Sequence, residues 1–176
     1  MKKIVITLLV CFFSFTAYTQ TTAKDYLNKG NEILFNNRDS SIFYITKAIE
    51  INPKNYEAYL ARCVAYWGGS SMIIIGTNTF TTKYEDDRDK AKNDIKKAML
   101  LSPNSSEVYS YMGTAYEYEY NYEDAINYYT IAIELKDYSS YYNRGRMNFH
   151  LQNYDLAKDD FTKFISHFPN EDNIYF

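Results

Sequence analysis

The feature of this sequence that most constrains its fold is a pattern that occurs four times. Residues 44–53, 94–103 and 160–169 each space apolar side chains three or four positions apart and end in a proline, and residues 128–137 follow the pattern without the proline. Apolar residues at this spacing lie on one face of an α-helix, and proline ends a helix because it lacks the N–H group of the next hydrogen bond. Each segment is therefore predicted to be a helix with one buried face.

A second helical segment precedes each of these helices and carries a small residue in its middle. An aromatic residue stands four positions before it every time, in the pairs Tyr26 and Gly30, Tyr59 and Cys63, Tyr109 and Gly113, and Tyr141 and Gly145. Gly inside a helix costs about 1 kcal/mol relative to Ala, so its recurrence predicts a close crossing with a neighbouring helix. We expect the other side of that contact to be formed by alanines of the second helices: Ala48, Ala98, Ala125, Ala132 and Ala157. A helix pair repeated about every 34 residues is typical of a solenoid.

From about residue 23 to residue 170 the pattern resembles the tetratricopeptide repeat family. The match is fullest over residues 143–161, closing at Pro169, and the third repeat matches through Gly113, Tyr116, Tyr122, Ala125, Tyr129 and Ala132. The resemblance implies an all-α fold, a right-handed α-solenoid of about four helix-turn-helix pairs. It places the domain at residues 21–176, with repeats at about 23–55, 56–105, 106–137 and 138–171.

The second repeat departs from the pattern by an insertion near residues 68–82, with about sixteen extra residues between its two helices. Residues 68–71 (Gly-Gly-Ser-Ser) should break the first helix, and the apolar run at 72–75 is expected either to pack on the solenoid or to contact a partner. The acidic run at residues 85–89 lacks the glycine and spacing of a calcium loop. We expect that run at a helix start, where the helix dipole favours acidic side chains.

Residues 1–20 are predicted to be a secretory signal peptide. Lys2 and Lys3 precede an almost wholly apolar run from Ile4 to Phe15, and small and polar residues follow it. The run is short for a membrane span, although an uncleaved anchor is the alternative. Cleavage at about residues 17–20 would export the chain to the periplasm or outside the cell.

The two cysteines add no disulfide to this prediction. Cys11 lies too early in the apolar run, and next to too bulky a neighbour, for lipidation. Cys63 then has no partner, and its helical neighbours predict a small inert thiol in the core.

Charge and motifs exclude several classes of function. The chain has 19 basic and 22 acidic side chains, a net charge of −3, so nothing attracts nucleic acid or anionic lipid in general. His150 and His167 are the only histidines and have no second ligand at metal-binding spacing. No phosphate loop or nucleophile elbow occurs. We therefore predict a protein that is not an enzyme and holds no metal or cofactor, with a hydrolase built from Ser, Asp and Tyr as the remotest alternative.

The resemblance implies that the first helices line a concave face that binds a protein or peptide partner. Aromatic rings offer contact area there, and amides or a guanidinium bond a backbone or carboxylate. Helical spacing around each small residue predicts the following residues on this face: Asn28, Asn31 and Phe35; Leu60, Val64 and Trp67; Tyr111, Thr114 and Tyr118; and Tyr142, Asn143, Arg146 and His150. The alternative is that part of this set packs between repeats. The carboxylate-clamping set known in the family is not carried over, because Leu27 and Ala61 stand where Lys and Asn are needed.

Two classes of function follow. The first is an exported, non-enzymatic interaction module or scaffold that holds a peptide or partner protein in its concave face. The second is a structural component of the cell envelope that self-associates along the solenoid axis. The last predicted helix motivates the second, because Phe161, Phe164, Ile165 and Phe168 are expected to be partly exposed and to form a homo-oligomer through the C-terminal end.

Overall fold

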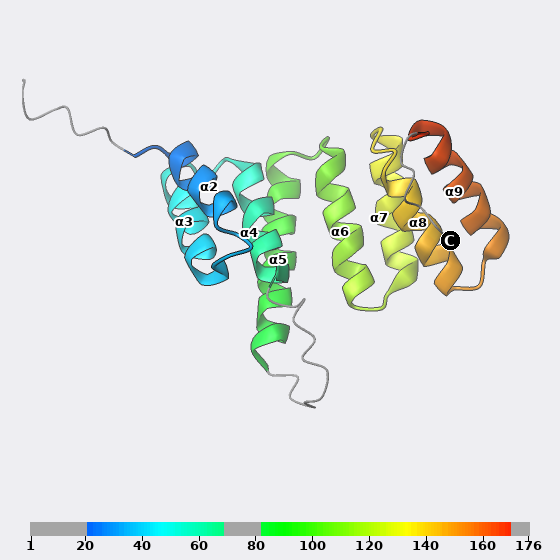
Figure 1. Cartoon of the computed structure of the whole chain (residues 1–176), viewed down its shortest axis with the longest axis horizontal. Helices are drawn as coiled ribbons and strands as arrows, with labels where there is room; N and C mark the ends of the chain where they lie inside the picture. The colour runs from blue at the N-terminus through cyan, green and yellow to red at the C-terminus, as the bar shows by residue number, and fades with distance from the viewer. Residues whose placement is uncertain (1–20, 69–81, 170–176) are drawn as a thin grey trace, which may run out of the picture.

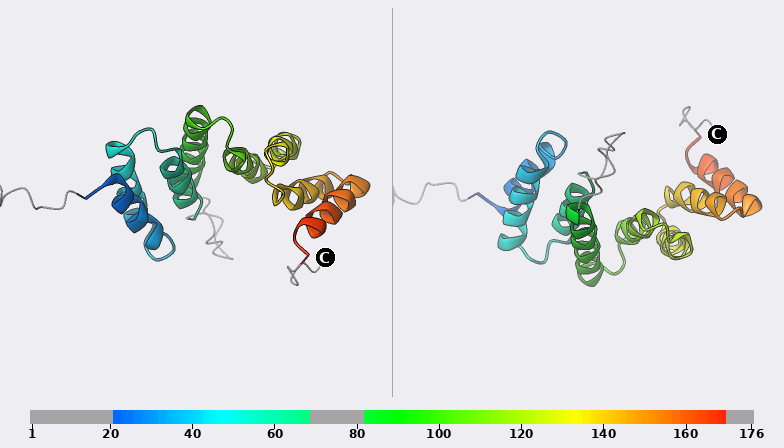
Figure 2. Two further views of the ribbon diagram at one scale, coloured as in Figure 1. Left: turned by 90° about the horizontal axis from the view of Figure 1, so that it is seen from above. Right: turned by 90° about the horizontal axis from the view of Figure 1, so that it is seen from below.

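The computed structural model describes residues 21–68 and 82–169, and within these ranges the chain forms eight α-helices and no strand. The helices form four antiparallel pairs: α2 (Ala23–Glu32) with α3 (Arg38–Ile51), α4 (Tyr56–Gly68) with α5 (Thr82–Leu101), α6 (Ser106–Tyr118) with α7 (Tyr122–Glu134), and α8 (Ser140–His150) with α9 (Tyr154–His167). The pairs follow one another along the long axis, with α2 and α9 at opposite ends (Figure 1), and each is turned relative to the one before (Figure 2). The prediction of an α-solenoid of four helix pairs is confirmed.

Polar side chains fix where several helices begin. Thr22 and Asp25 form a reciprocal capping box, since the Thr22 N–H donates to Asp25 at 2.8 Å and the Asp25 N–H donates to the Thr22 hydroxyl at 3.2 Å. Asn37 and Asn121 cap α3 and α7 by accepting from backbone N–H groups three residues on, at 3.0 and 3.2 Å. These bonds satisfy donors that the first turn of a helix leaves unpaired.

Three helices end in a left-handed residue that is not glycine. Tyr120, Lys136 and Gln152 have φ of 59°, 74° and 62°, and each allows the next N–H to donate to the carbonyl five residues back, at 2.9 to 3.0 Å. This arrangement satisfies carbonyls at a helix C-terminus. At Lys136 it ends the second helix of the third repeat, which lacks the proline of the other repeats.

The predicted close crossing of paired helices is present, but its partners differ from those expected. A Cβ atom added to any of the three glycines in the middle of a first helix would meet a large side chain of the paired helix: Ile45 at 2.5 Å from Gly30, Tyr129 at 2.7 Å from Gly113, and Phe161 at 2.8 Å from Gly145. The predicted alanines are buried within one helical turn of these contacts. At the three glycine crossings the assignment of alanines as the partners was wrong, because the space of the missing side chain is filled by a ring or an Ile branch. The assignment of Ala98 opposite Cys63 stays a prediction.

The core runs through the first three pairs and includes Cys63, which is fully buried. Burial, with a smaller effect of Asp94, raises the pKa of the Cys63 thiol, so the thiol is protonated at neutral pH. The acidic run at residues 85–89 does not start a helix, since α5 begins at Thr82. Asp87 in this run is buried and forms an ion pair with Arg38 of α3, so its role is to join two helix pairs.

Several predictions concern residues outside the described ranges. The signal peptide at residues 1–20 and most of the insertion, residues 69–81, lie there, as do residues 170–176. Among the helices that the structure does describe, none has the length and apolar character needed to cross a membrane.

Candidate partner-binding face

The first helix pair exposes its predicted partner-binding residues. Asn28 and Asn31 on α2 are exposed, and Phe35, in the turn after α2, has 92% of its surface accessible. All three side chains are therefore accessible to a partner.

The predicted residues of α4 lie mostly inside the solenoid. Leu60 and Trp67 are only 3% and 9% exposed, and Val64 is half-buried. The Trp67 ring stacks on Tyr111 of α6 at 5.6 Å between centroids and contacts the Tyr118 ring at 5.5 Å. Trp67 therefore joins the second and third pairs and offers little of its ring to a partner.

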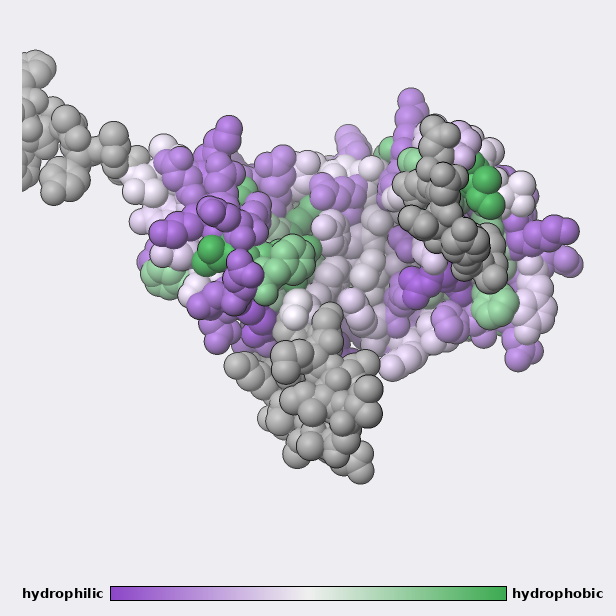
Figure 3. All heavy atoms as spheres, viewed as in Figure 1, coloured by the Kyte–Doolittle hydropathy of each residue, from purple (hydrophilic) through white to green (hydrophobic). Residues whose placement is uncertain are grey.

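An open cleft lies beside this aromatic group, between the first half of α6 and the turn that leads into α8. Its volume is about 410 Å³, and its lining is Ser106, Glu107, Ser110, Tyr111, Thr114, Asp137 and Ser139. Two of these residues, Tyr111 and Thr114, were predicted for the concave face. The cleft thus combines one aromatic wall with hydroxyls and carboxylates. In Figure 3 the surface is mostly hydrophilic to pale, with hydrophobic residues gathered in small groups.

The cleft carries negative charge. Partial burial, then the neighbouring Glu57 and Asp137 carboxylates, raise the pKa of Glu107 above its usual range. Burial, with Glu107 next in effect, also raises the pKa of the Tyr111 hydroxyl, which therefore stays neutral at physiological pH. Asp137 accepts from the Ser140 hydroxyl at 2.6 Å and so positions the start of α8. This environment favours uncharged donors and cations over anions.

The predicted residues of α8 divide between the surface and the interior. Tyr142 is half-buried against Phe161 and Phe164 of α9, at 5.8 and 5.5 Å between ring centroids. Tyr142, which was predicted for the concave face, therefore packs between the two helices of its own pair. Asn143 is half-buried, and His150 is exposed and stacks on the Tyr122 ring at 4.9 Å.

Arg146 already has a carboxylate partner within the chain. Its guanidinium lies 2.8 Å from Glu117 of α6, and Glu117 also accepts from the buried Tyr129 hydroxyl at 3.0 Å. Arg146 thus joins the third and fourth pairs. A partner carboxylate would have to compete with Glu117 for it.

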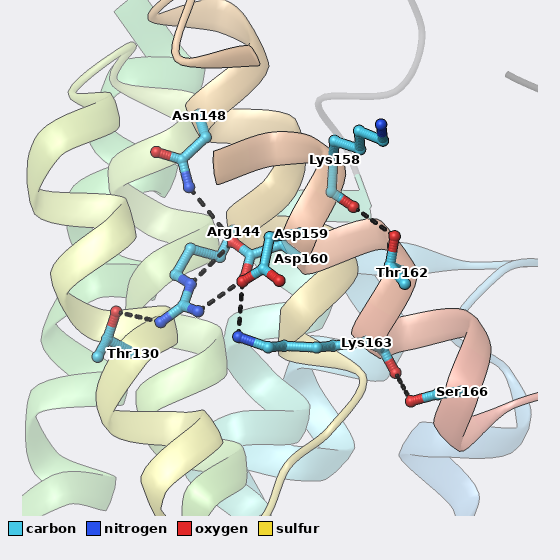
Figure 4. A network of polar contacts seen from close by, with 9 residues as sticks. All are labelled: Thr130, Arg144, Asn148, Lys158, Asp159, Asp160, Thr162, Lys163 and Ser166. Carbon is cyan, nitrogen blue, oxygen red and sulfur yellow. Dashed lines mark hydrogen bonds and ion pairs between the residues drawn. The ribbon is translucent and has the colours of Figure 1, made fainter. Parts of the chain in front are cut away.

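A buried polar network that was not predicted from the sequence recurs in two repeats. Arg144 donates two hydrogen bonds to Asp160, at 3.0 and 2.7 Å, and one to Thr130 of the preceding pair at 2.9 Å (Figure 4). The Asp160 side chain is only 2% exposed and also accepts from Asn148 at 3.3 Å. One arginine therefore joins both helices of its own pair to the pair before.

The same network occurs between the first and second pairs. Arg62 donates to Asp94 at 2.8 and 2.7 Å and to Thr46 of α3 at 3.2 Å. Both arginines stand just before the small residue of a first helix. An alignment of the repeats on that small residue would have revealed the shared position.

The described part of the chain was also searched for groups of side chains that could bind a metal ion. No three side chains of His, Cys, Asp or Glu gather there in a way that could hold a metal ion. The described helices thus form a scaffold that carries a polar cleft on α6.

Residues 138–170 match the tetratricopeptide repeat family, and this segment is the fourth helix pair. Tetratricopeptide repeat protein 6 of Homo sapiens is 29% identical over 133 residues, which cover 74% of this chain and 22% of that protein. The mitochondrial import receptor subunit TOM70 of Saccharomyces cerevisiae is 43% identical over 73 residues, 40% of this chain and 12% of TOM70. The comparisons support the tetratricopeptide repeat family for this chain, and the chain spans only a small part of these relatives.

A solved structure agrees with this fold. PilW, described as a widely conserved type IV pilus biogenesis factor, superposes with a TM-score of 0.68 at 18% identity, covering 84% of this chain and 62% of PilW. At that level of identity the likeness concerns the fold alone.

Proposed function

We propose that this chain is an exported interaction scaffold that binds a peptide, or an extended segment of a partner protein, along its first helices. The observation that carries the proposal is the cleft of about 410 Å³ on α6, which Tyr111 and Thr114 line. A rigid ring and several hydroxyls suit recognition of an extended backbone, since the ring supplies contact area and the hydroxyls pair with amide groups. The scaffold acts by binding alone.

Export to the cell envelope is part of this proposal. It is supported by the apolar run at residues 4–15 behind two lysines, which has the pattern of a signal peptide. Detection of the chain in periplasmic or secreted fractions, shortened by about 20 residues, would test it.

The binding site is tested by filling the cleft. Ser106 is a half-buried residue of the cleft, and Asn127 is exposed on α7. We expect Ser106→Trp to lose a partner captured from envelope extract, whereas Asn127→Trp retains it, with both variants melting within a few degrees of wild type. Equal capture by both variants would place binding outside the cleft, and the residues 72–75 would be the next candidate.

Self-association is a second candidate function, favoured by the outer face of α9. Ile165 there is 47% exposed, whereas Ile49, at the equivalent position of α3, is 9% exposed because the next helix pair covers it. Phe164, in contrast, is only 7% exposed and packs on Tyr142. Phe164 is therefore a core residue, and Ile165→Glu is the proper variant to weaken an association through this face.

A further inference from the structure

The outer face of α9 carries a residue equivalent to those that join neighbouring helix pairs inside the solenoid. Arg62 and Arg144 donate to Thr46 and Thr130 of the preceding helix pair. Each threonine directly follows the residue that contacts the glycine of its own repeat, Ile45 or Tyr129. Thr162 of α9 has the same position, one residue after Phe161. Its hydroxyl donates to the carbonyl four residues back at 2.8 Å, as Thr130 does. Thr162 is exposed, so its acceptor lone pairs face solvent.

We propose that a second copy of the chain stacks head to tail on this face, with its α2 against α9 in the register of the internal junctions. The proposal rests on the self-association proposed above and specifies its geometry. Lys29 immediately precedes Gly30, as Arg144 precedes Gly145, so in this register it lies opposite Thr162 of the other copy. Lys29 is exposed in the single chain, with its ammonium group 4.5 Å from the Tyr44 ring centroid.

Charge makes the two ends complementary. Glu32 stands two residues after Gly30, a position that the fully buried Ala65 and Met147 hold in later pairs. Lys158 stands where α7 has Ile126, which packs against the cluster that contains Met147. Both Glu32 and Lys158 are exposed. By analogy with Ile126 and Met147, stacking in this register brings Glu32 of one copy close to Lys158 of the next. Inside the array the equivalent lysine of α5, Lys92, also pairs with a carboxylate across its junction, Glu119 at the end of α6, at 2.8 Å.

Such a contact joins two different surfaces of the same chain. A head-to-tail interface does not close on itself unless the rotation allows a ring, so further copies can add at either end. Opposite charges at each end also favour this orientation, since two α9 faces would bring Lys158 against Lys158. The proposed contact thus joins the polar face of α2 to the outer face of α9, which carries both polar and apolar side chains.

The test is a charge exchange followed by sedimentation velocity over a range of concentrations. Lys158→Glu alone and Glu32→Lys alone should each weaken self-association of the chain by about tenfold or more, because like charges then meet at the contact. An equimolar mixture of the two variants should restore association to the wild-type level, since each junction again pairs opposite charges. Lys54→Glu and Glu123→Lys, exposed residues away from both faces, serve as matched controls and should have no effect.

The outcomes separate this geometry from self-association in general. If Ile165→Glu abolishes association but Glu32→Lys leaves it unchanged, two α9 faces meet each other and the head-to-tail contact is wrong. If the wild-type chain sediments as a monomer at every concentration, both proposals fail. Failure of the mixture to associate, with both variants folded, would also overturn the proposed pairing of Glu32 with Lys158.

Discussion

Replacing Arg144 should destabilise the chain far more than replacing Lys163, a surface lysine whose ion pair with Asp159 is about as short. Arg144→Met leaves the Asp160 carboxylate, which is 2% exposed, with the Asn148 amide at 3.3 Å as its remaining side-chain donor. Removing one partner of a buried ion pair costs about 3–5 kcal/mol, because a charge remains that is neither solvated nor paired. The Arg144 side chain is 19% exposed, so water can reach the vacated space and we expect about 3 kcal/mol.

A double variant separates the pair from the packing. Arg144→Met with Asp160→Leu removes both charges, and replacing a buried ion pair by apolar side chains is often neutral or stabilising. We therefore expect the double variant to lie within about 1 kcal/mol of wild type. The difference between it and the sum of the single variants is the coupling energy of the pair.

The assay is urea unfolding followed by circular dichroism at 222 nm, with hydrogen exchange of α8 and α9 as a local readout. Lys163→Met is the control, because it breaks an exposed pair with Asp159 at 2.6 Å. A surface pair of this kind contributes about 0.2–1 kcal/mol. A loss for Arg144→Met no larger than that for Lys163→Met would refute the reasoning.

Three further predictions concern the described helices. Gly113→Ala should destabilise by about 1–3 kcal/mol in urea unfolding, because the added Cβ would lie 2.7 Å from the buried Tyr129 ring; a neutral effect would show that the ring moves freely. Gln152→Gly should stabilise by about 0.5–1 kcal/mol in the same assay, because glycine adopts its φ of 62° without strain, whereas Gln152→Ala should gain nothing. Glu107→Gln should raise the melting temperature at pH 7 but not near pH 4. The pKa of Glu107 is raised in the fold, so its charged form is disfavoured there, and this penalty is present above the folded pKa and disappears as pH falls below the unfolded value.

The fold could be predicted from the sequence because the same pattern of aromatic, small and apolar residues occurs in each repeat. A small residue with an aromatic residue four positions before it marks the crossing point of each first helix, and four occurrences in phase fix the helix pairs. The partner side of the crossing could not be read from the pattern. Ile45, Tyr129 and Phe161 share a position but no residue type. Only their common distance from the small residue identifies them.

The candidate site was predicted less well, for a reason that helical geometry explains. Residues are rotated by about 100° from one to the next around a helix. The face that crosses another helix therefore includes the positions three residues before and four residues after the small residue. Leu60, Tyr142 and Trp67 hold these positions, and they are buried or half-buried. Positions two before, one after and five after the small residue point away from that crossing face. Asn31 and His150 are such positions and are exposed, whereas Tyr111 and Arg146 are half-buried because they contact Trp67 and Glu117 of neighbouring pairs.

The middle junction of the solenoid shows how the chain replaces the arginine network. Met112 stands just before Gly113, where Arg62 and Arg144 stand in their repeats, and it is buried. Tyr128 stands at the position of Asp160 and stacks on Tyr116 at 5.3 Å between centroids. An apolar and aromatic pair thus takes the place of an ion pair at the same position of the same fold. Because that junction packs with neither charge, removing both charges from the fourth pair should be tolerated, while removing Arg144 alone should not.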